Sequence, residues 1–242
     1  MSTLSGGPNI ITDSSLVLYL DAANNKSYIS GSTTWNDVSK VGNTGTLLNG
    51  IGYTSSYNGE LVFDGSDDRM QLGSSISLTT SCTFNQWTQP LSGSATTMNT
   101  LTYYTLGTAK TLLYSQLIKS SGIWYHQTLV SGYPTYPQEM NVYFQSNVTQ
   151  FVQNNIPYNS SFTWERIPGV GSTLKTYING VFREQLINTN DYWANTASLD
   201  TAKYEIPPSF KGNIGMMSSY NRALTSQEIL QNYNTTKGRF GL

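Results

Sequence analysis

The chain has few of the features that assign a chemistry directly. It contains one cysteine, Cys82, so no disulfide can form within the chain and no thiolate metal cluster is available. Charged residues make up only 11% of the chain, and 13 Lys and Arg stand against 14 Asp and Glu, with no run of like charge. Binding to a phosphate backbone needs a basic patch, so the composition argues against nucleic acid as a partner.

Long apolar runs are also missing. No stretch approaches the length needed to cross a membrane, and residues 1–8 show no basic segment followed by an apolar one. We therefore expect no membrane partner and a protein that is made and assembled in a cytoplasm.

The hydrophobic residues, 38% of 242, suffice for one sizeable core. They follow a period of two rather than 3.6, and turn residues recur about every ten positions, which is typical of an all-β sandwich. Residues 1–14, rich in Ser, Gly and Thr, are predicted to form an N-terminal arm, and 15–242 a single β-sandwich domain. Strands are predicted at 16–20 (a central strand), 46–50, 60–65, 82–88, 111–118, 123–129, 140–145, 148–152 and 210–220.

Two local signals are specific. Asn179-Gly180 separates two alternating segments, 174–178 and 181–184, and this pair tolerates the positive φ angles of a type I′ turn, so a β-hairpin is predicted there. Thr225 and Glu228 have the spacing of a capping box, which predicts one short helix at the C-terminus.

Three segments carry a family resemblance: residues 16–24 (LVLYLDAAN), 62–68 (VFDGSDD), and 177–181 (YINGV) with 220–225 (YNRALT). They resemble the laminin G-like, concanavalin A-like jelly-roll domains that are common in phage virion proteins, including those of cyanophages. The resemblance covers both ends of the chain, whereas the middle, about residues 91–172, matches only in length and strand rhythm.

The resemblance implies two facing antiparallel sheets with the first and last strands adjacent, and a phage virion as the home of the protein. Three positions depart from the family pattern. Gln86 and Thr88 stand where the family has inward-pointing apolar residues, and Ser219 replaces an apolar residue beside Tyr220. Either the register shifts there or that face meets something polar.

The sequence gives no support for catalysis. The β-glucanases that share this fold are similar to one another in a Glu-x-Asp-x-Glu strand, which points three carboxylates into one cleft. That strand is absent, and His126, the sole histidine, has no serine or thiol motif around it and is read as a structural or surface residue. We therefore expect a protein that is not an enzyme. The glutamates stand singly at positions 60, 139, 165, 184, 205 and 228.

One loop could hold a metal. Asp64, Asp67 and Asp68 offer three carboxylates close together, and clustered oxygen ligands of this kind can bind calcium, as in some laminin G-like relatives. The alternative is that Asp64 and Asp67 accept hydrogen bonds from their own turn while Asp68 caps the next strand. Apart from calcium, no cofactor is predicted.

Aromatic residues in two loops could stack on sugar rings. Tyr133 and Tyr136 lie in a proline-containing segment, and Tyr192 and Trp193 lie in an Asn-rich one. They are the predicted glycan-binding residues. The alternative is that tyrosines in a β-sandwich are mostly half-buried strand residues or interface contacts.

Protein docking is the remaining option. A polar, weakly charged surface, an arm that ends in Ile10 and Ile11, and a tail at residues 240–242 all fit a module that attaches to an assembly. The leading hypothesis is a non-enzymatic structural protein on the surface of a tailed-phage virion, as a capsid decoration or a neck, baseplate or tail accessory. The alternative is a lectin-like module of a tail fibre or adhesin that recognises host glycan. Expected partners are other virion proteins, host glycan, or further copies of the chain.

Overall fold

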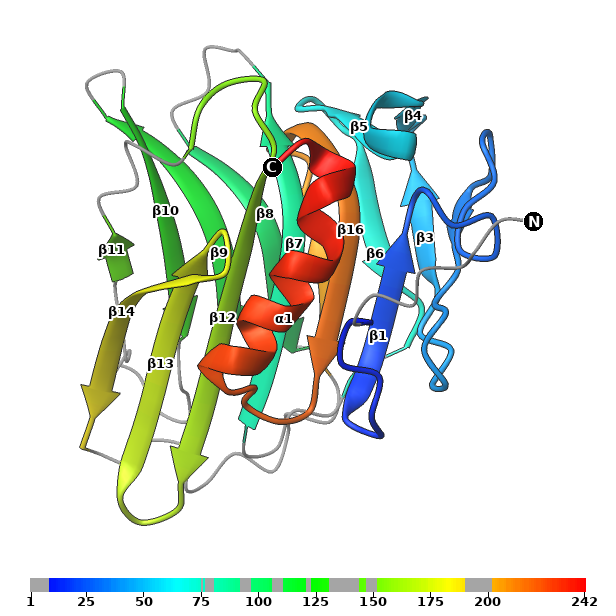
Figure 1. The fold of residues 1–242 in the computed structure, drawn as a ribbon. Coiled ribbons are helices and arrows are strands. Elements are labelled where there is room, and N and C mark those ends of the chain that lie inside the picture. Colours follow the sequence, from blue (N-terminus) through cyan, green and yellow to red (C-terminus); the bar gives the residue numbers. More distant parts are fainter. Residues whose placement is uncertain are drawn as a thin grey trace.

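A computed structural model describes residues 9–74, 76, 81–91, 97–105, 111–120, 123–130, 144–146, 152–189 and 202–242, in some of the strands by backbone alone. Two antiparallel sheets face each other, and a C-terminal helix crosses the outside of one of them (Figure 1). This arrangement confirms the predicted β-sandwich with one short helix. No helix in these ranges is long and apolar enough to span a membrane.

The sheet that lies beneath the helix is called sheet A. Its strands follow one another in the order β14 (Val181–Asn188), β13 (Gly171–Ile178), β12 (Tyr158–Ile167), β7 (Ser81–Pro90), β16 (Lys211–Tyr220), β5 (Glu60–Asp64) and β4 (Gly52–Thr54), and β1 (Leu16–Asp21) also pairs with β16.

The facing sheet is called sheet B. Its order is β11 (Phe144–Ser146), β10 (Ile123–Val130), β9 (Thr111–Ser120), β8 (Thr97–Thr105), β15 (Ala202–Ile206), β6 (Arg69–Leu72), β3 (Gly45–Leu48) and β2 (Thr34–Trp35). The helix is α1 (Ser226–Thr236), and two 3-10 turns, η1 (Ser56–Asn58) and η3 (Lys237–Phe240), complete the elements.

The predicted local signals are confirmed. Asn179 and Gly180 have φ angles of 52° and 72°, as a type I′ turn requires, and β13 and β14 form the expected hairpin. Thr225 caps α1, with its side chain bound to the Glu228 amide and the Glu228 carboxylate bound to the Thr225 amide. The first and last strands, β1 and β16, are adjacent, as the resemblance implied.

One strand prediction is wrong in its position. β1 was expected in the middle of a sheet, but within the described ranges it pairs with β16 alone. A loop lies along its other edge, where Asp37 Oδ1 accepts a hydrogen bond from the Tyr19 amide at 2.8 Å and Asn43 Nδ2 donates to the Val17 carbonyl at 2.9 Å. These side-chain contacts replace a neighbouring strand and explain why an edge strand is buried on both faces.

Five strands of three or more residues were not anticipated: β4, β6, β8, β12 and β15. The predicted strand at 140–145 begins only at Phe144 in the described part, and the one at 148–152 lies outside it except for Val152, which is not in a strand.

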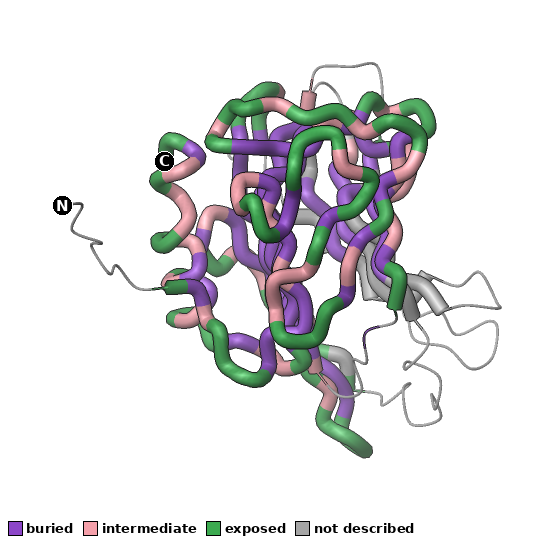
Figure 2. Tube along the Cα trace, turned by 90° about the vertical axis from the view of Figure 1, so that its right-hand side faces the viewer, coloured by how far each residue is buried: buried purple, intermediate pink, exposed green. Residues whose placement is uncertain are grey.

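The core lies between the sheets, where the buried parts of the chain gather (Figure 2), and its residues come from most strands of both sheets. Phe84 of β7 packs 5.7 Å from Phe162 of β12 and 5.5 Å from Tyr204 of β15, measured between ring centroids, so one aromatic group joins both sheets.

The three departures from the family pattern have a common explanation. Gln86, Thr88 and Ser219 are at most 1% exposed and share the inward face with Phe84, so the register has not shifted. Ser219 Oγ and the Tyr204 hydroxyl are hydrogen-bonded at 3.1 Å, and Gln86 Nε2 donates to the Thr100 carbonyl at 3.4 Å. The inward face therefore meets polar groups of the opposite sheet.

Candidate functional site

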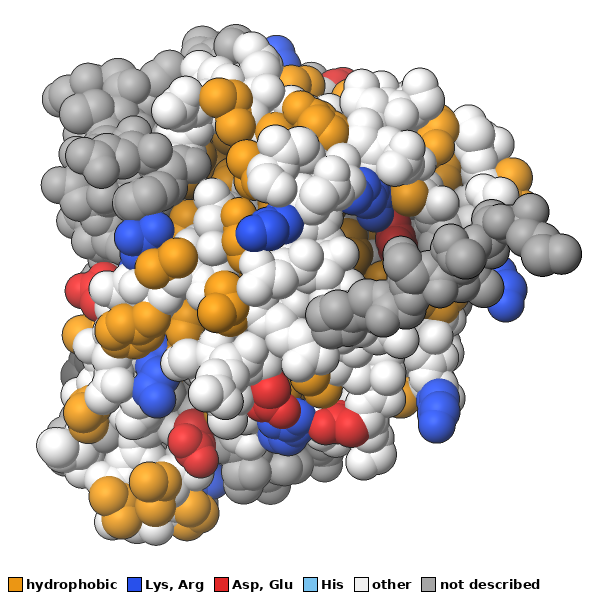
Figure 3. Space-filling view, viewed as in Figure 1, with side chains coloured by type: hydrophobic (Ala, Val, Ile, Leu, Met, Phe, Trp, Pro, Cys, Tyr) orange, Lys and Arg blue, Asp and Glu red, His pale blue; other side chains and the backbone are white. Residues whose placement is uncertain are grey.

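The two outer faces of the sandwich differ in what covers them. On sheet A, α1 and η3 lie across β7 and β16 (Figure 1). Trp87 Nε1 donates to Thr236 Oγ1 at 2.9 Å, and the Phe240 ring stacks on Trp87 at 4.1 Å with only 10° between the planes. Trp87 is fully buried as a result, so no ligand can reach this part of the sheet. Charged side chains on this face are few and scattered (Figure 3).

The outer face of sheet B carries a fixed polar group. Met70 and Leu72 of β6 fill the core, so Arg69 and Gln71 point the opposite way, as does Glu205 of β15. Arg69 Nη2 donates to both carboxylate oxygens of Glu205 at 2.9 Å, and its Nε donates to Oε1 at 3.3 Å.

Gln71 completes this group. Its Nε2 donates to Glu205 Oε2 at 3.0 Å, and the backbone register places Gln71 directly opposite Glu205. The Glu205 side chain is 8% exposed and that of Arg69 36%, so the carboxylate is held in place while part of the guanidinium faces solvent. We call Arg69, Gln71 and Glu205 the Arg69 cluster.

A second polar pair shares this face. Gln116 of β9 and Gln127 of β10 are paired across the strands, their neighbours Leu117 and His126 point into the core, and Gln116 Nε2 donates to Gln127 Oε1. Both amides are at most 9% exposed. Sheet B thus carries hydrogen-bonded polar side chains on its outer side in four of its strands, and among them Arg69 and Gln71 are partly exposed.

Sequence reasoning missed the Arg69 cluster. Arg69 and Glu205 are 136 positions apart, and only the order of the strands brings them together. The alternation of Arg-Met-Gln-Leu and of Tyr-Glu-Ile could have indicated which side chains face outward, but not that the two strands are neighbours.

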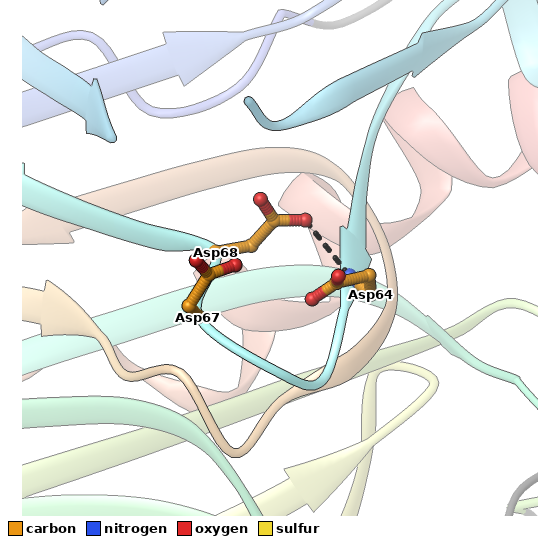
Figure 4. A group of neighbouring side chains, drawn as sticks. All are labelled: Asp64, Asp67 and Asp68. Atoms are coloured by element: carbon orange, nitrogen blue, oxygen red, sulfur yellow. Dashed lines mark hydrogen bonds between the residues drawn. The ribbon is translucent and has the colours of Figure 1, made fainter. Parts of the chain in front are cut away.

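The three aspartates predicted as a calcium site do come together, at the turn between β5 and β6 (Figure 4). One carboxylate oxygen from each lies within 4.8 Å of the others. Asp64 Oδ1 accepts from the Ser66 amide at 2.7 Å, and Asp68 Oδ2 accepts from the Asp64 amide at 2.9 Å. Asp64 accepts from its own turn, as the alternative interpretation expected, whereas Asp68 bonds back to the end of β5 and does not cap the next strand through this contact.

The electrostatics of this turn follow from its hydrogen bonds and burial. The backbone amide of Ser66 lowers the pKa of Asp64, whereas burial raises the pKa of Asp68, with the charges of Asp64 and Asp67 adding to the rise. Calcium needs six to eight oxygen ligands, and the turn supplies three carboxylates of which two already serve the backbone. The geometry favours a self-satisfied turn over a metal site.

The predicted glycan-binding residues Tyr133, Tyr136, Tyr192 and Trp193 lie outside the described residues. Their place in the chain is still informative, because the segment that contains Tyr192 and Trp193 leads directly into β15, the strand of Glu205.

His126 is a core residue, as one of its two sequence interpretations expected. It is 1% exposed, its Nε2 lies 3.3 Å from Ser115 Oγ, and its Nδ1 lies 3.5 Å from the Tyr158 hydroxyl. Burial lowers the pKa of His126 to about 4. The imidazole is therefore neutral at neutral pH and sealed between the sheets.

No protein-family model and no curated protein sequence matches the chain. Solved structures do share its fold. One match is the receptor binding domain of botulinum neurotoxin C/D mosaic serotype. It covers 93% of this chain and 52% of that domain, with a TM-score of 0.67 and 13% identity. A second similar structure is that of botulinum neurotoxin type C, a toxin whose cell entry is described as dependent on interaction with two ganglioside molecules. The match covers 93% of this chain and 52% of that chain, with a TM-score of 0.65 and 11% identity.

A third similar structure is matched over its whole length. Domain 4 of AbnA, an extracellular arabinanase of Geobacillus stearothermophilus, was solved in complex with arabinotriose, and the chain covers 98% of it and 90% of itself, with a TM-score of 0.59 and 17% identity. Against the toxin domains the chain spans only about half of their length. At these identities the likeness shows a common fold: the chain is a β-sandwich of the jelly-roll kind.

Proposed function

We propose that this chain is a non-enzymatic carbohydrate-binding module, and that it binds saccharide through the outer face of sheet B around the Arg69 cluster. The observation that carries the proposal is the fixed geometry of that cluster. Arg69 and Gln71 both donate hydrogen bonds to the Glu205 carboxylate, while the Arg69 side chain stays partly exposed. Prearranged donors and acceptors of this kind suit sugar hydroxyls, which both donate and accept hydrogen bonds.

The charge of the cluster favours a neutral saccharide over a charged polymer. Glu205 offsets the charge of Arg69, and the whole chain has a formal net charge of -1. A polyanion would find no basic surface to bind. The ring of a neutral sugar needs an aromatic partner as well, and Tyr192 and Trp193, which precede β15, are the residues that we expect to supply it.

The structural neighbours support a binding role. The domain of AbnA that is matched over its whole length holds an oligosaccharide, and the toxin domains are described as receptor binding domains. The toxin domains are twice as long as the matched segment, so the ganglioside contact of those proteins supports only the general class of ligand.

Three of the described glutamates, at positions 60, 205 and 228, are held in the fold and not presented to a substrate. Glu205 is paired with Arg69, Glu228 is paired with Arg222 at 2.6 Å, and Glu60 is buried beneath the C-terminal turn. Glycoside hydrolysis needs two carboxyl groups that face each other across the scissile bond, and these three are engaged in holding the fold.

The arm and the tail support docking onto a virion less than the sequence suggested, because both pack against their own domain. Ile10 is 7% exposed and Ile11 packs against the cluster of Leu16, Tyr177 and Tyr220, so the apolar residues of the arm contact their own domain. Phe240 of the tail is likewise buried. A virion location, after assembly in a host cytoplasm, stays a prediction from the family resemblance, and it is compatible with a receptor-binding role there.

A glycan array tests the proposal. The wild-type domain is expected to bind at least one neutral oligosaccharide, and the double variant Arg69→Met with Glu205→Gln is expected to weaken that binding at least about tenfold. Both partners change together, so no unpaired charge is left on the sheet. The double variant Lys175→Met with Glu165→Gln makes the same change of charge on the outer face of sheet A and should bind as the wild type does. An array with no bound glycan, or equal loss in both variants, would overturn the proposal.

A further inference from the structure

A carboxyl group is enclosed on sheet A, whereas the Arg69 cluster lies on sheet B. Glu60 is the first residue of β5 and is 0% exposed. Leu61 and Phe63 point into the core, so Glu60 lies on the opposite, outer face of sheet A, as do Asn213 of β16 and Gln89 of β7. Asn213 and Gln89 are at most 8% exposed.

The hydrogen bonds fix the orientation of the Asn213 amide. Its Nδ2 donates to Gln89 Oε1 at 2.8 Å and to Glu60 Oε2 at 3.1 Å. Gln89 Nε2 in turn donates to the Asn155 carbonyl at 2.7 Å, so the oxygen of Gln89 must face Asn213. Both hydrogens of Asn213 Nδ2 are then used, and its Oδ1 is left as an acceptor.

Two oxygens of this pair lack a donor. Glu60 Oε1 and Asn213 Oδ1 are both buried, and neither has a hydrogen-bond partner in the described part of the chain. A buried acceptor without a donor costs about 1–3 kcal/mol, and more when it carries charge. A single proton on Glu60 satisfies both oxygens. Protonated Glu60 donates a hydrogen bond through Oε1, and the free acceptor is Oδ1 of Asn213, whose Nδ2 already donates to Glu60.

We propose that Glu60 is held as the neutral carboxylic acid and forms a cyclic pair with the Asn213 amide. In this pair Asn213 Nδ2 donates to Glu60 Oε2, and the hydroxyl of Glu60 donates to Asn213 Oδ1. Both buried oxygens are satisfied, and no charge remains inside the protein.

The charged groups around the pair are consistent with a proton rather than a metal ion. Arg239 of η3 is the charged group that acts on Glu60, and it is already bound to Asp21 of β1 at 2.5 Å and to the carbonyls of Tyr57 and Gly59 at 2.6 and 2.5 Å. Its charge is matched there. Two free oxygens beside a guanidinium are far short of the ligands that a hard cation requires.

The pair has a predictable effect on stability. Burial raises the pKa of Glu60 above the ordinary 4.5, so the folded state binds this proton at pH values where the unfolded chain has lost it. Stability from this group is then complete below 4.5 and is lost as the pH rises through the folded pKa. The pairing of β5 with β16, where Glu60 meets Asn213, is therefore firmer in mild acid.

Infrared spectroscopy with ¹³C-labelled glutamate tests the proposal on the whole domain. A protonated glutamate C=O band is expected at about pH 6, where a free glutamate is ionised. The band should be missing in Glu60→Gln, which can keep both hydrogen bonds, and unchanged in Glu165→Gln, a substitution at an exposed site. Glu60→Gln should also remove the loss of stability on raising the pH. Absence of the band in the wild type, or its persistence in Glu60→Gln, would overturn the proposal.

Discussion

At the scale of single residues, the unusual feature is how many polar side chains are buried between the sheets. Thr100 Oγ1 donates to Ser115 Oγ at 3.1 Å, Ser115 contacts His126, and Thr128 and Tyr158 lie within 3.5 Å of the same ring. Such a network specifies one packing arrangement because each misplaced partner leaves a buried polar atom unsatisfied. It also makes the core sensitive to protonation.

The pH dependence of stability should reveal His126. Its pKa is about 4 in the folded state and 6.5 when unperturbed, so its contribution is complete above 6.5 and is lost as the pH falls toward 4. The loss amounts to about 3 kcal/mol. Urea unfolding at a series of pH values would measure it, and His126→Gln should flatten the profile between 6.5 and 4.5. An unchanged slope in that variant would show that the histidine is not the cause.

Asp13 and Glu228 act in a lower range. Their hydrogen bonds, to Ser15 and to Arg222 respectively, lower the pKa of each to about 2, so the stability that they contribute is lost only below their ordinary values of 3.8 and 4.5. The pH range in which Asp13 and Glu228 act therefore lies below that of His126, and one titration of stability against pH can separate the two.

Calcium is expected to have no effect on the turn at Asp64, Asp67 and Asp68. The Asp64 and Asp68 carboxylates are engaged with the backbone, and burial raises the pKa of Asp68, which disfavours the charged form that calcium needs. Calorimetric titration with CaCl₂ should show no saturable heat, and the thermal midpoint should not move on adding a chelator. Saturable heat that disappears in Asp64→Asn with Asp67→Asn would contradict this expectation.

At the scale of elements, the C-terminal segment holds the chain ends together. Arg239 joins η3 to β1 and to the loop before β5, and Phe240 stacks on Trp87 of β7 while lying 5.8 Å from Tyr57. At the start of α1 the hydroxyls of Ser226 and Tyr177 lie 3.1 Å apart, and in its second half Asn232 accepts from the Ile11 amide at 2.8 Å. The helix is thus secured at both ends and covers sheet A as a fixed part of the fold.

Removing the Phe240 ring should weaken the fold substantially. Phe240→Ala is expected to lower the free energy of unfolding by about 3 kcal/mol, because a buried aromatic ring is lost and a cavity is left over Trp87. Leu242→Ala, two residues further at an exposed site, should change it by less than about 0.5 kcal/mol. Chemical denaturation of the three proteins measures both, and a small effect of Phe240→Ala would mean that the tail is not a structural contact.

The hairpin turn can be tested against a matched glycine. Gly180 has a φ of +72°, and a Cβ there would lie 2.8 Å from Tyr233 of α1. Gly31 has a similar φ of +85° but open space around it. Both alanine variants should lose about 1 kcal/mol from backbone strain, and Gly180→Ala should lose about 1–3 kcal/mol more. Equal losses in thermal unfolding would show that helix and hairpin are not in contact.

At the scale of the whole molecule, local signals in the sequence predicted the ends of the domain better than its middle. The Asn179-Gly180 turn and the capping box at Thr225 depend on residues close together in the chain, and both are confirmed. β12 was missed because only its core face carries aromatic residues, whereas its outer face carries Asn, Ser, Thr and Glu, of which only Thr is typical of a strand. Asn159 and Ser161 are buried on the outer face, where they bond to each other and to Asn85.

The candidate site was not predictable for a different reason. The Arg69 cluster exists only because β15 inserts between β6 and β8, and strand order is a property of the folded chain. Conversely, the aspartate turn was visible in the sequence, but the hydrogen bonds that Asp64 and Asp68 accept from the backbone were not. The sequence shows which residue types are present, whereas the role of each depends on the residues that it contacts in the folded chain.

The central claim is that saccharide binds to the outer face of sheet B. The most direct measurement is backbone amide chemical-shift mapping of the ¹⁵N-labelled domain during titration with an oligosaccharide that it binds on an array. Saturable shifts are expected in β6 and β15, at Arg69, Gln71 and Glu205, with α1 and β7 unaffected. Shifts confined to α1 or to sheet A would contradict the claim.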